Sequence, residues 1–210
     1  MEKSNVINKH TTRYILLTVI VVVLTVVFLV GRPQTALADK IIVPDVPYNL
    51  KVQDGAKVFL VGHAIGFQNY VCLPSGAGVA WNLFTPQAIL FDDTHEQIIT
   101  HFFSPNPETG VVRATWIHSH DSSTIWAALA PDGASTDQKF VAQGAIPWLL
   151  LNVEKFRDGP TGGDKLSDTI QVQRLNTSGG VAPATGCASL SDIGAKAFVP
   201  YTADYFFYKQ

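Results

Sequence analysis

The apolar segments of this sequence are joined by connections too short to contain helices. From Asp45 onward, short runs of β-branched and aromatic residues alternate with Gly, Pro, Asn and Asp, and no long stretch repeats its apolar residues every 3.6 positions. Parallel strands need crossovers of about a dozen residues or more, usually helical. The pattern therefore predicts a single-domain, antiparallel all-β fold, either a β-sandwich or, as the alternative, a closed β-barrel.

Eleven segments have the composition of strands. They are residues 48–52, 57–64, 68–73, 79–84, 88–91, 98–103, 111–117, 124–129, 146–153, 169–174 and 197–208. We expect Pro200 to bend the last of these strands or to place it at an edge. The glycine-rich segment 155–168 is expected to be a loop, and residues 189–194 a short helical turn.

The first 38 residues form a separate segment. Lys3, Lys9 and Arg13 precede an unbroken apolar run at 14–30, and a small-x-small motif ends at Ala38. This arrangement predicts a helical signal peptide at 1–38 that is cleaved before Asp39. The alternative is an uncleaved membrane anchor at 14–30, although a helix of this length spans only about 25 Å.

The segment 39–210 has the length of one domain with its own core. After residue 38 the chain holds 11 basic and 16 acidic residues, which gives a net charge of −5. This balance argues against nucleic acid as a partner. No second apolar run of membrane length follows, so we expect contact with a membrane only through an uncleaved N-terminal segment.

The chain contains two cysteines, Cys72 and Cys187, and both follow the predicted cleavage point. A protein sent to an oxidising compartment usually pairs such residues. We therefore predict one disulfide, which would add about 4 kcal/mol of stability in the chain-entropy model. Two free buried thiols are the alternative.

Three histidines are candidate metal ligands. His118 and His120 are two positions apart, so their side chains would lie on one face of a strand, and His101 could be a third ligand. The competing interpretation is structural: His118 ends an inward row of apolar residues, and His120 falls in a turn. No other cofactor is expected.

Catalytic motifs are otherwise missing from the sequence. There is no nucleophile elbow around any serine, and the glycines at 159–163 have neither the spacing nor the following helix of a phosphate-binding loop. The sequence thus favours a non-catalytic protein.

Several longer motifs together resemble the exported family catalogued as domain of unknown function 3455. They are GFQNYVC at 66–72, PQAILFD at 86–92, IPWLLL at 146–151, IQVQRLNT at 170–177, GGVAPA at 179–184, GC at 186–187 and VPYTADYFFY at 199–208. The resemblance covers about residues 47–208. It implies export, and it places Cys72 and Cys187 in the family's two cysteine-bearing motifs.

The resemblance brings no established reaction. Some fungal members carry a malate dehydrogenase label, but a strand-only pattern has no place for a dinucleotide site, so we expect no such activity. His101 falls where the family often has a histidine, whereas His118 and His120 do not. We expect a secreted binding or structural module that recognises an extracellular ligand or cell-surface component. The alternative function is a metal-assisted enzyme using the histidines.

Overall fold

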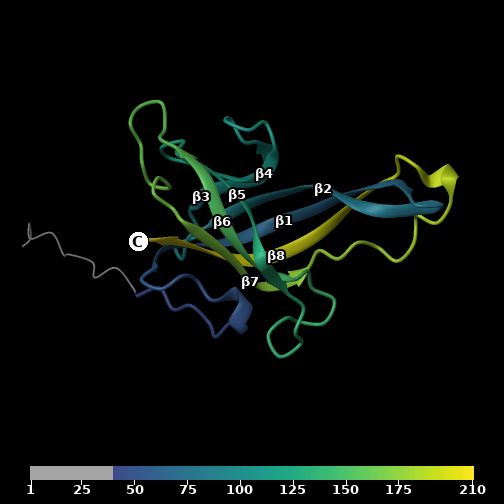
Figure 1. Ribbon diagram of the computed structural model, residues 1–210, viewed down its shortest axis with the longest axis horizontal. Coiled ribbons are helices and arrows are strands. Elements are labelled where there is room, and N and C mark those ends of the chain that lie inside the picture. Colours follow the sequence, from purple (N-terminus) through teal and green to yellow (C-terminus); the bar gives the residue numbers. More distant parts are fainter. Residues whose placement is uncertain (1–39) are drawn as a thin grey trace, which may run out of the picture. The chain divides into compact units, whose positions relative to one another are not determined.

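Eight antiparallel strands follow one another around a closed barrel in this computed structural model (Figure 1). The structure describes residues 40–210, and the predicted signal peptide or anchor lies outside them. The strands are β1 (Lys57–Ser75), β2 (Gly78–Phe91), β3 (Gln97–Pro105), β4 (Val112–His118), β5 (Thr124–Ser135), β6 (Trp148–Arg157), β7 (Gln171–Gly179) and β8 (Lys196–Lys209). Two short 3₁₀ helices are η1 (Tyr48–Leu50) and η2 (Leu190–Asp192). Within the described range, no helix is long and apolar enough to cross a membrane.

The all-β, antiparallel prediction is confirmed, and the architecture is the barrel rather than the sandwich favoured first. The deciding feature is β1, which pairs with both β2 and β8: His63 has Phe91 as its partner on one side and Asp204 on the other. The first and last strands are therefore joined, and the sheet closes on itself. With every pair antiparallel, the barrel also lacks the parallel sheet that a dinucleotide fold requires.

β1 is one continuous strand where the sequence predicted two. The predicted break fell near Gly66, because glycine commonly marks a turn. Instead, Gly66 lets two strands approach closely: a Cβ atom there would lie 2.2 Å from the carbonyl oxygen of Gln87 and 2.6 Å from Cα of Ala88. The segments predicted at 79–84 and 88–91 are likewise joined as β2.

The segment 41–56 packs on the outside of the barrel. Leu50, fully buried, joins the outward residues Trp148, Leu150 and Phe206 in a second apolar cluster. The carbonyl of Leu50 accepts a hydrogen bond of 2.6 Å from Gln173 Nε2. The strand predicted at 48–52 is therefore wrong: residues 48–50 form η1, and the segment covers the sheet without joining it.

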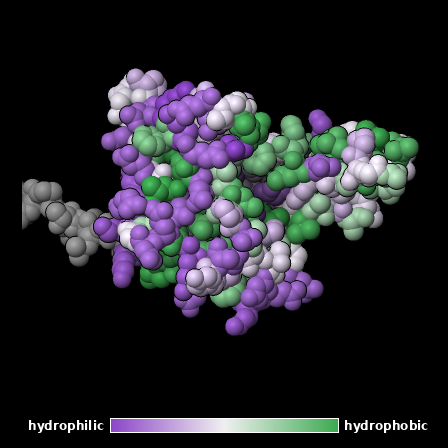
Figure 2. Space-filling model, in the orientation of Figure 1, coloured by the Kyte–Doolittle hydropathy of each residue, from purple (hydrophilic) through white to green (hydrophobic). Residues whose placement is uncertain are grey.

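Three strands extend beyond the barrel as an arm, which we define as residues 69–75 of β1, 78–85 of β2 and 196–200 of β8 (Figure 1, right). The predicted disulfide is confirmed there: Cys72 on β1 is bonded to Cys187 in the loop that precedes η2. The backbone of Cys72 also bonds to Gly194 and Ala195. Figure 2 shows hydrophobic residues over much of this arm.

Candidate functional site

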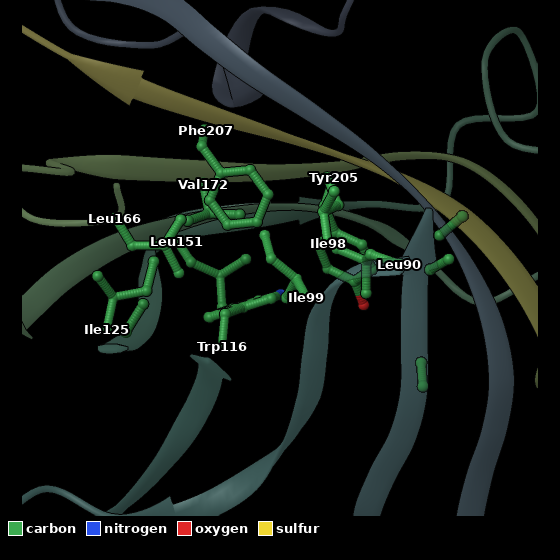
Figure 3. Close-up of a cluster of buried hydrophobic side chains, with 14 of the residues drawn as sticks. Leu90, Ile98, Ile99, Trp116, Ile125, Leu151, Leu166, Val172, Tyr205 and Phe207 are labelled. Atoms are coloured by element: carbon green, nitrogen blue, oxygen red, sulfur yellow. The ribbon is translucent and has the colours of Figure 1, made fainter. Parts of the chain in front are cut away.

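Inside the barrel, one end is filled by apolar side chains. Ile99, Ile125 and Phe207 point inward from three strands, and Leu166 joins them from the loop between β6 and β7; all four are fully buried. In Figure 3, Leu166 and Ile125 lie on one side of this cluster, and Leu90 and Tyr205 lie on the other. The loop thus closes this end with a side chain of its own.

Asp121 holds that loop in place. Its Oδ1 accepts hydrogen bonds from the backbone N–H and the hydroxyl of Ser123, at 2.9 and 2.7 Å, and its Oδ2 accepts one from the backbone N–H of Lys165 at 2.9 Å. The hydroxyl of Ser123 in turn accepts a hydrogen bond from the backbone N–H of Leu166. Desolvation opposes ionisation of Asp121, but these hydrogen bonds prevail and lower its pKa to about 2.

The glycines of the loop permit this close packing. A Cβ atom on Gly159 would lie 1.7 Å from the carbonyl oxygen of Asp121, and one on Gly163 would lie 2.2 Å from Cβ of Asp121. Segment 158–169 is therefore a structural closure, in line with the predicted loop. We call Asp121, Ser123 and Leu166 the closing contact.

Two of the predicted metal ligands lie beside this contact. His118 donates from Nδ1 to Asp121 Oδ1 at 3.0 Å, and His120 lies at the surface, where its Nε2 is 3.1 Å from Glu96 Oε1. His101 is elsewhere, on β3, with its ring stacked on Trp116. Across residues 40–210, no three His, Cys, Asp or Glu side chains are grouped to hold a metal. The geometry supports the structural interpretation of His118.

The opposite end of the barrel contains a cavity of about 400 Å³. This volume falls within the range of sites that hold small molecules. Its wall is mainly apolar, with contributions from Leu83, Pro86, Phe103, Val112, Leu149 and Leu151. Leu83 and Val112 are also exposed to solvent, so they form part of the rim. The interior is thus packed at one end and hollow at the other.

Arg174 is the unexpected residue in this wall. It lies on β7 between Leu149 of β6 and Tyr205 of β8, and only 9% of its surface is exposed. Its Nη2 donates to the carbonyl oxygen of Pro147 at 2.8 Å. No carboxylate in the described part of the chain forms an ion pair with it, whereas arginine keeps its positive charge in proteins.

A second arginine at the same cavity shows the contrast. Arg113 on β4 donates to both carboxylate oxygens of Glu154, from Nε at 2.6 Å and from Nη2 at 3.1 Å. This is the two-bond pairing that arginine and carboxylates commonly form. The charge of Arg113 is therefore compensated within the protein, and the charge of Arg174 is not.

Three buried hydrogen-bond donors around the cavity lack acceptors. Within residues 40–210, Gln68 Nε2, Trp116 Nε1 and Arg174 Nε have no partner. They come from three different strands, β1, β4 and β7. Buried donors are paired in most proteins, and an unpaired one costs about 1 to 3 kcal/mol. All three donors belong to residues that line the cavity.

His101 adds an uncharged ring to this wall. Burial lowers its pKa to about 3, and the positive charge of Arg174 acts in the same direction, against a hydrogen bond to Thr115. Because the carbonyl of Thr115 can only accept, Nδ1 of His101 carries the proton. The rings of His101 and Trp116 are stacked with centroids 4.4 Å apart.

The tyrosines near Arg174 are also uncharged. Burial raises the pKa of Tyr205, and the charge of Arg174 offsets only part of that shift. Burial likewise raises the pKa of Tyr201, whose hydroxyl lies 3.2 Å from that of Tyr205. Arg174 is thus the one uncompensated charge that the described residues place at this cavity.

Sequence reasoning found His101 but missed Arg174 and Gln68. A signal was present, because Val172 and Arg174 alternate with two glutamines and so share one face of a strand. An arginine on the same face as a buried valine was the clue. This arginine would indicate a site only if its face of the strand pointed into the barrel. The sequence pattern alone did not show which face does so.

Comparisons with known proteins place this chain in a family without assigning a function. The model of a family described as "Protein of unknown function (DUF3455)" matches residues 53–209. No curated protein and no solved structure matches the chain. This match covers most of the sequence and all eight barrel strands. The chain therefore belongs to the family of proteins of unknown function DUF3455.

Proposed function

We propose that this protein is a secreted binding module that holds a small, mainly apolar molecule inside its barrel. The observation that carries the proposal is the 400 Å³ cavity, which has an apolar wall and unpaired buried donors. Most ligand sites combine an apolar wall with a few polar groups in this way. An empty apolar cavity also lowers stability, so an occupant would offset a cost in the fold.

The disulfide and the sequence of the first 38 residues support the extracellular part of the proposal. The Cys72–Cys187 bond is consistent with an extracellular protein, since disulfides persist mainly in oxidising compartments. Retention at the cell surface through residues 14–30 is the alternative location. In both cases the partner is an extracellular ligand, and no catalytic group is required.

The binding test uses 1-decanol, a neutral molecule with a long apolar body. We expect titration calorimetry to show saturable binding, and the tryptophan fluorescence of the protein to change with the same affinity, because the ring of Trp116 lies in the cavity wall. The variant Ala114→Phe should abolish binding, since Ala114 faces the cavity from β4 and a larger side chain would occupy the space.

The matched control is Ala184→Phe, which adds the same ring at an exposed position in the loop after β7. It should bind 1-decanol as the unaltered protein does. Thermal unfolding of both variants verifies that each is folded. If folded Ala114→Phe binds 1-decanol as well as the unaltered protein does, the cavity is not the binding site.

A further inference from the structure

We propose that the molecule held in the barrel carries a carboxylate, and that Arg174 binds this group. The inference rests on the proposed function, because it requires the cavity to be a ligand site. It goes further by naming the chemical class of the ligand: a small monocarboxylate with an apolar body.

The first argument is the charge balance of the cavity. Arg174 is buried at the wall, and its positive charge has no acidic partner among residues 40–210. Tyr205 is uncharged, and a histidine can only be neutral or positive, so neither Tyr205 nor His101 compensates this charge. Burying a charge without a partner is strongly unfavourable, and proteins usually pair such groups. A negatively charged ligand would supply the missing partner.

The second argument is the type of hydrogen-bonding group. All three unpaired atoms at the cavity, on Gln68, Trp116 and Arg174, are N–H donors. N–H donors call for acceptor atoms, and a carboxylate offers two oxygens with about four lone-pair sites. A cationic ligand would add donors and a like charge. An alcohol would offer one oxygen and no charge.

The third argument separates a carboxylate from a phosphate. Phosphate sites usually collect several cationic side chains or a helix N-terminus. Arg113 is already bonded to Glu154, and the described barrel has no helix end directed at the cavity. A single arginine therefore matches a single negative charge.

Size defines the rest of the ligand. If each non-hydrogen atom takes roughly the volume of a water molecule, about 30 Å³, the cavity holds about a dozen such atoms. Decanoic acid has this size, and its chain would lie against Leu83, Phe103 and Leu151. It serves as the probe, with 1-decanol as the uncharged equivalent.

The experiment compares the affinities of decanoate and 1-decanol by titration calorimetry at neutral pH, below the concentration at which decanoate forms micelles. We expect decanoate to bind at least about tenfold more tightly, the difference expected of hydrogen bonds to a charged group. In the variant Arg174→Met, the affinity for decanoate should fall at least about tenfold while that for 1-decanol is retained.

The control variant is Arg157→Gln, which removes the same charge at an exposed position, where Arg157 lies over the ring of Trp126. Its affinity for decanoate should change less than about twofold, which excludes a general effect of net charge. Arg174→Lys keeps the charge but loses the planar fork, so its affinity for decanoate should lie between those of the unaltered protein and Arg174→Met.

The outcomes distinguish the two proposals. If decanoate and 1-decanol bind equally well, or if Arg174→Met loses affinity for both to the same degree, the carboxylate inference is wrong and the cavity remains a ligand site. If neither molecule binds to the unaltered protein, the proposed function itself fails. If decanoate is preferred and only Arg174→Met loses that preference, the inference stands.

Discussion

The two ends of the barrel interior are built on opposite principles. At the closed end, Leu166 fills the space, and Asp121 accepts a hydrogen bond from the backbone of Lys165 that keeps the loop in place. At the open end, Arg174, Gln68 and Trp116 line a cavity and have unpaired donors. One end contributes stability, and the other retains groups that are costly to the isolated fold. Such a division is typical of proteins whose binding site reduces their stability.

Removing Leu166 should produce the largest loss, because it opens the end that is now packed. We expect Leu166→Ala to lower the free energy of unfolding by about 3 kcal/mol, as for other large buried aliphatic residues. Chemical denaturation measures this change. The exposed Leu190→Ala should lose less than about 0.5 kcal/mol. Equal losses in the two variants would show that the closing loop does not contribute to the core.

Replacing Asp121 tests the hydrogen bonds of the same end. Asp121→Ala should lower the free energy of unfolding by about 2 kcal/mol at neutral pH, because the buried donors of Ser123 and the backbone N–H of Lys165 lose their acceptor. Backbone hydrogen exchange in segment 158–169 should be faster in this variant than in the unaltered protein. A variant as stable as the unaltered protein would mean that the loop is held by Leu166 alone.

The pH dependence of this effect has a definite direction. The pKa of Asp121 in the folded protein is lowered to about 2 from an ordinary value of 3.8. Its contribution is therefore complete above about pH 4, and it is lost as the pH falls through about 2. The stability difference between Asp121→Ala and the unaltered protein should shrink over that range, as followed by thermal unfolding. A difference that grows on acidification would contradict the assignment.

At the open end, we expect a substitution to raise the free energy of unfolding instead of lowering it. Without ligand, Arg174→Met should raise the free energy of unfolding by about 1 kcal/mol, because an unpaired buried charge is replaced by an apolar side chain of similar length. Arg113→Gln should instead lower it slightly, since it breaks the solvent-exposed pair with Glu154. A clear loss of stability in Arg174→Met would show that Arg174 serves the fold, and the contrast between the two ends would disappear.

The smallest effects concern the histidines beside the closing contact. His118→Ala should cost about 1 kcal/mol, because it removes a largely buried ring bonded to Asp121, and His120→Ala less than about 0.5 kcal/mol at its exposed position. A metal chelator should leave the melting temperature unchanged. Stabilisation by added zinc that disappears in both variants would revive the metal hypothesis.

Local patterns were enough to predict an antiparallel all-β fold, although they divided β1 and β2 and placed a strand at 48–52, and they could not distinguish a barrel from a sandwich. Both architectures have alternating residues and short turns, and the choice depends on whether β1 meets β8. That pairing joins residues such as His63 and Asp204, which no local pattern links. The disulfide was predictable because two cysteines in a chain that is predicted to be exported leave one pairing.

The candidate site could not be predicted from local sequence patterns, for a similar reason. Trp116 is 48 positions from Gln68 and 58 from Arg174 in the sequence, and the three residues meet through the register of the closed sheet. The segment 41–56 also made it difficult to predict which face of β7 points into the barrel. Because it covers the outward glutamine Gln173, both faces of this strand are buried, and the usual polar-outside rule does not reveal which face is interior.

The pairing of β1 with β8 also determines when the barrel can close during synthesis and folding. His63 and Asp204 are 141 positions apart, so the barrel cannot close until nearly the whole polypeptide has been made. Contacts between such distant segments slow folding, and until they form, the edge of β1 stays open to pairing with other chains. The finished fold therefore depends on its last fourteen-residue strand, and truncation within β8 would leave an aggregation-prone open sheet instead of a smaller barrel.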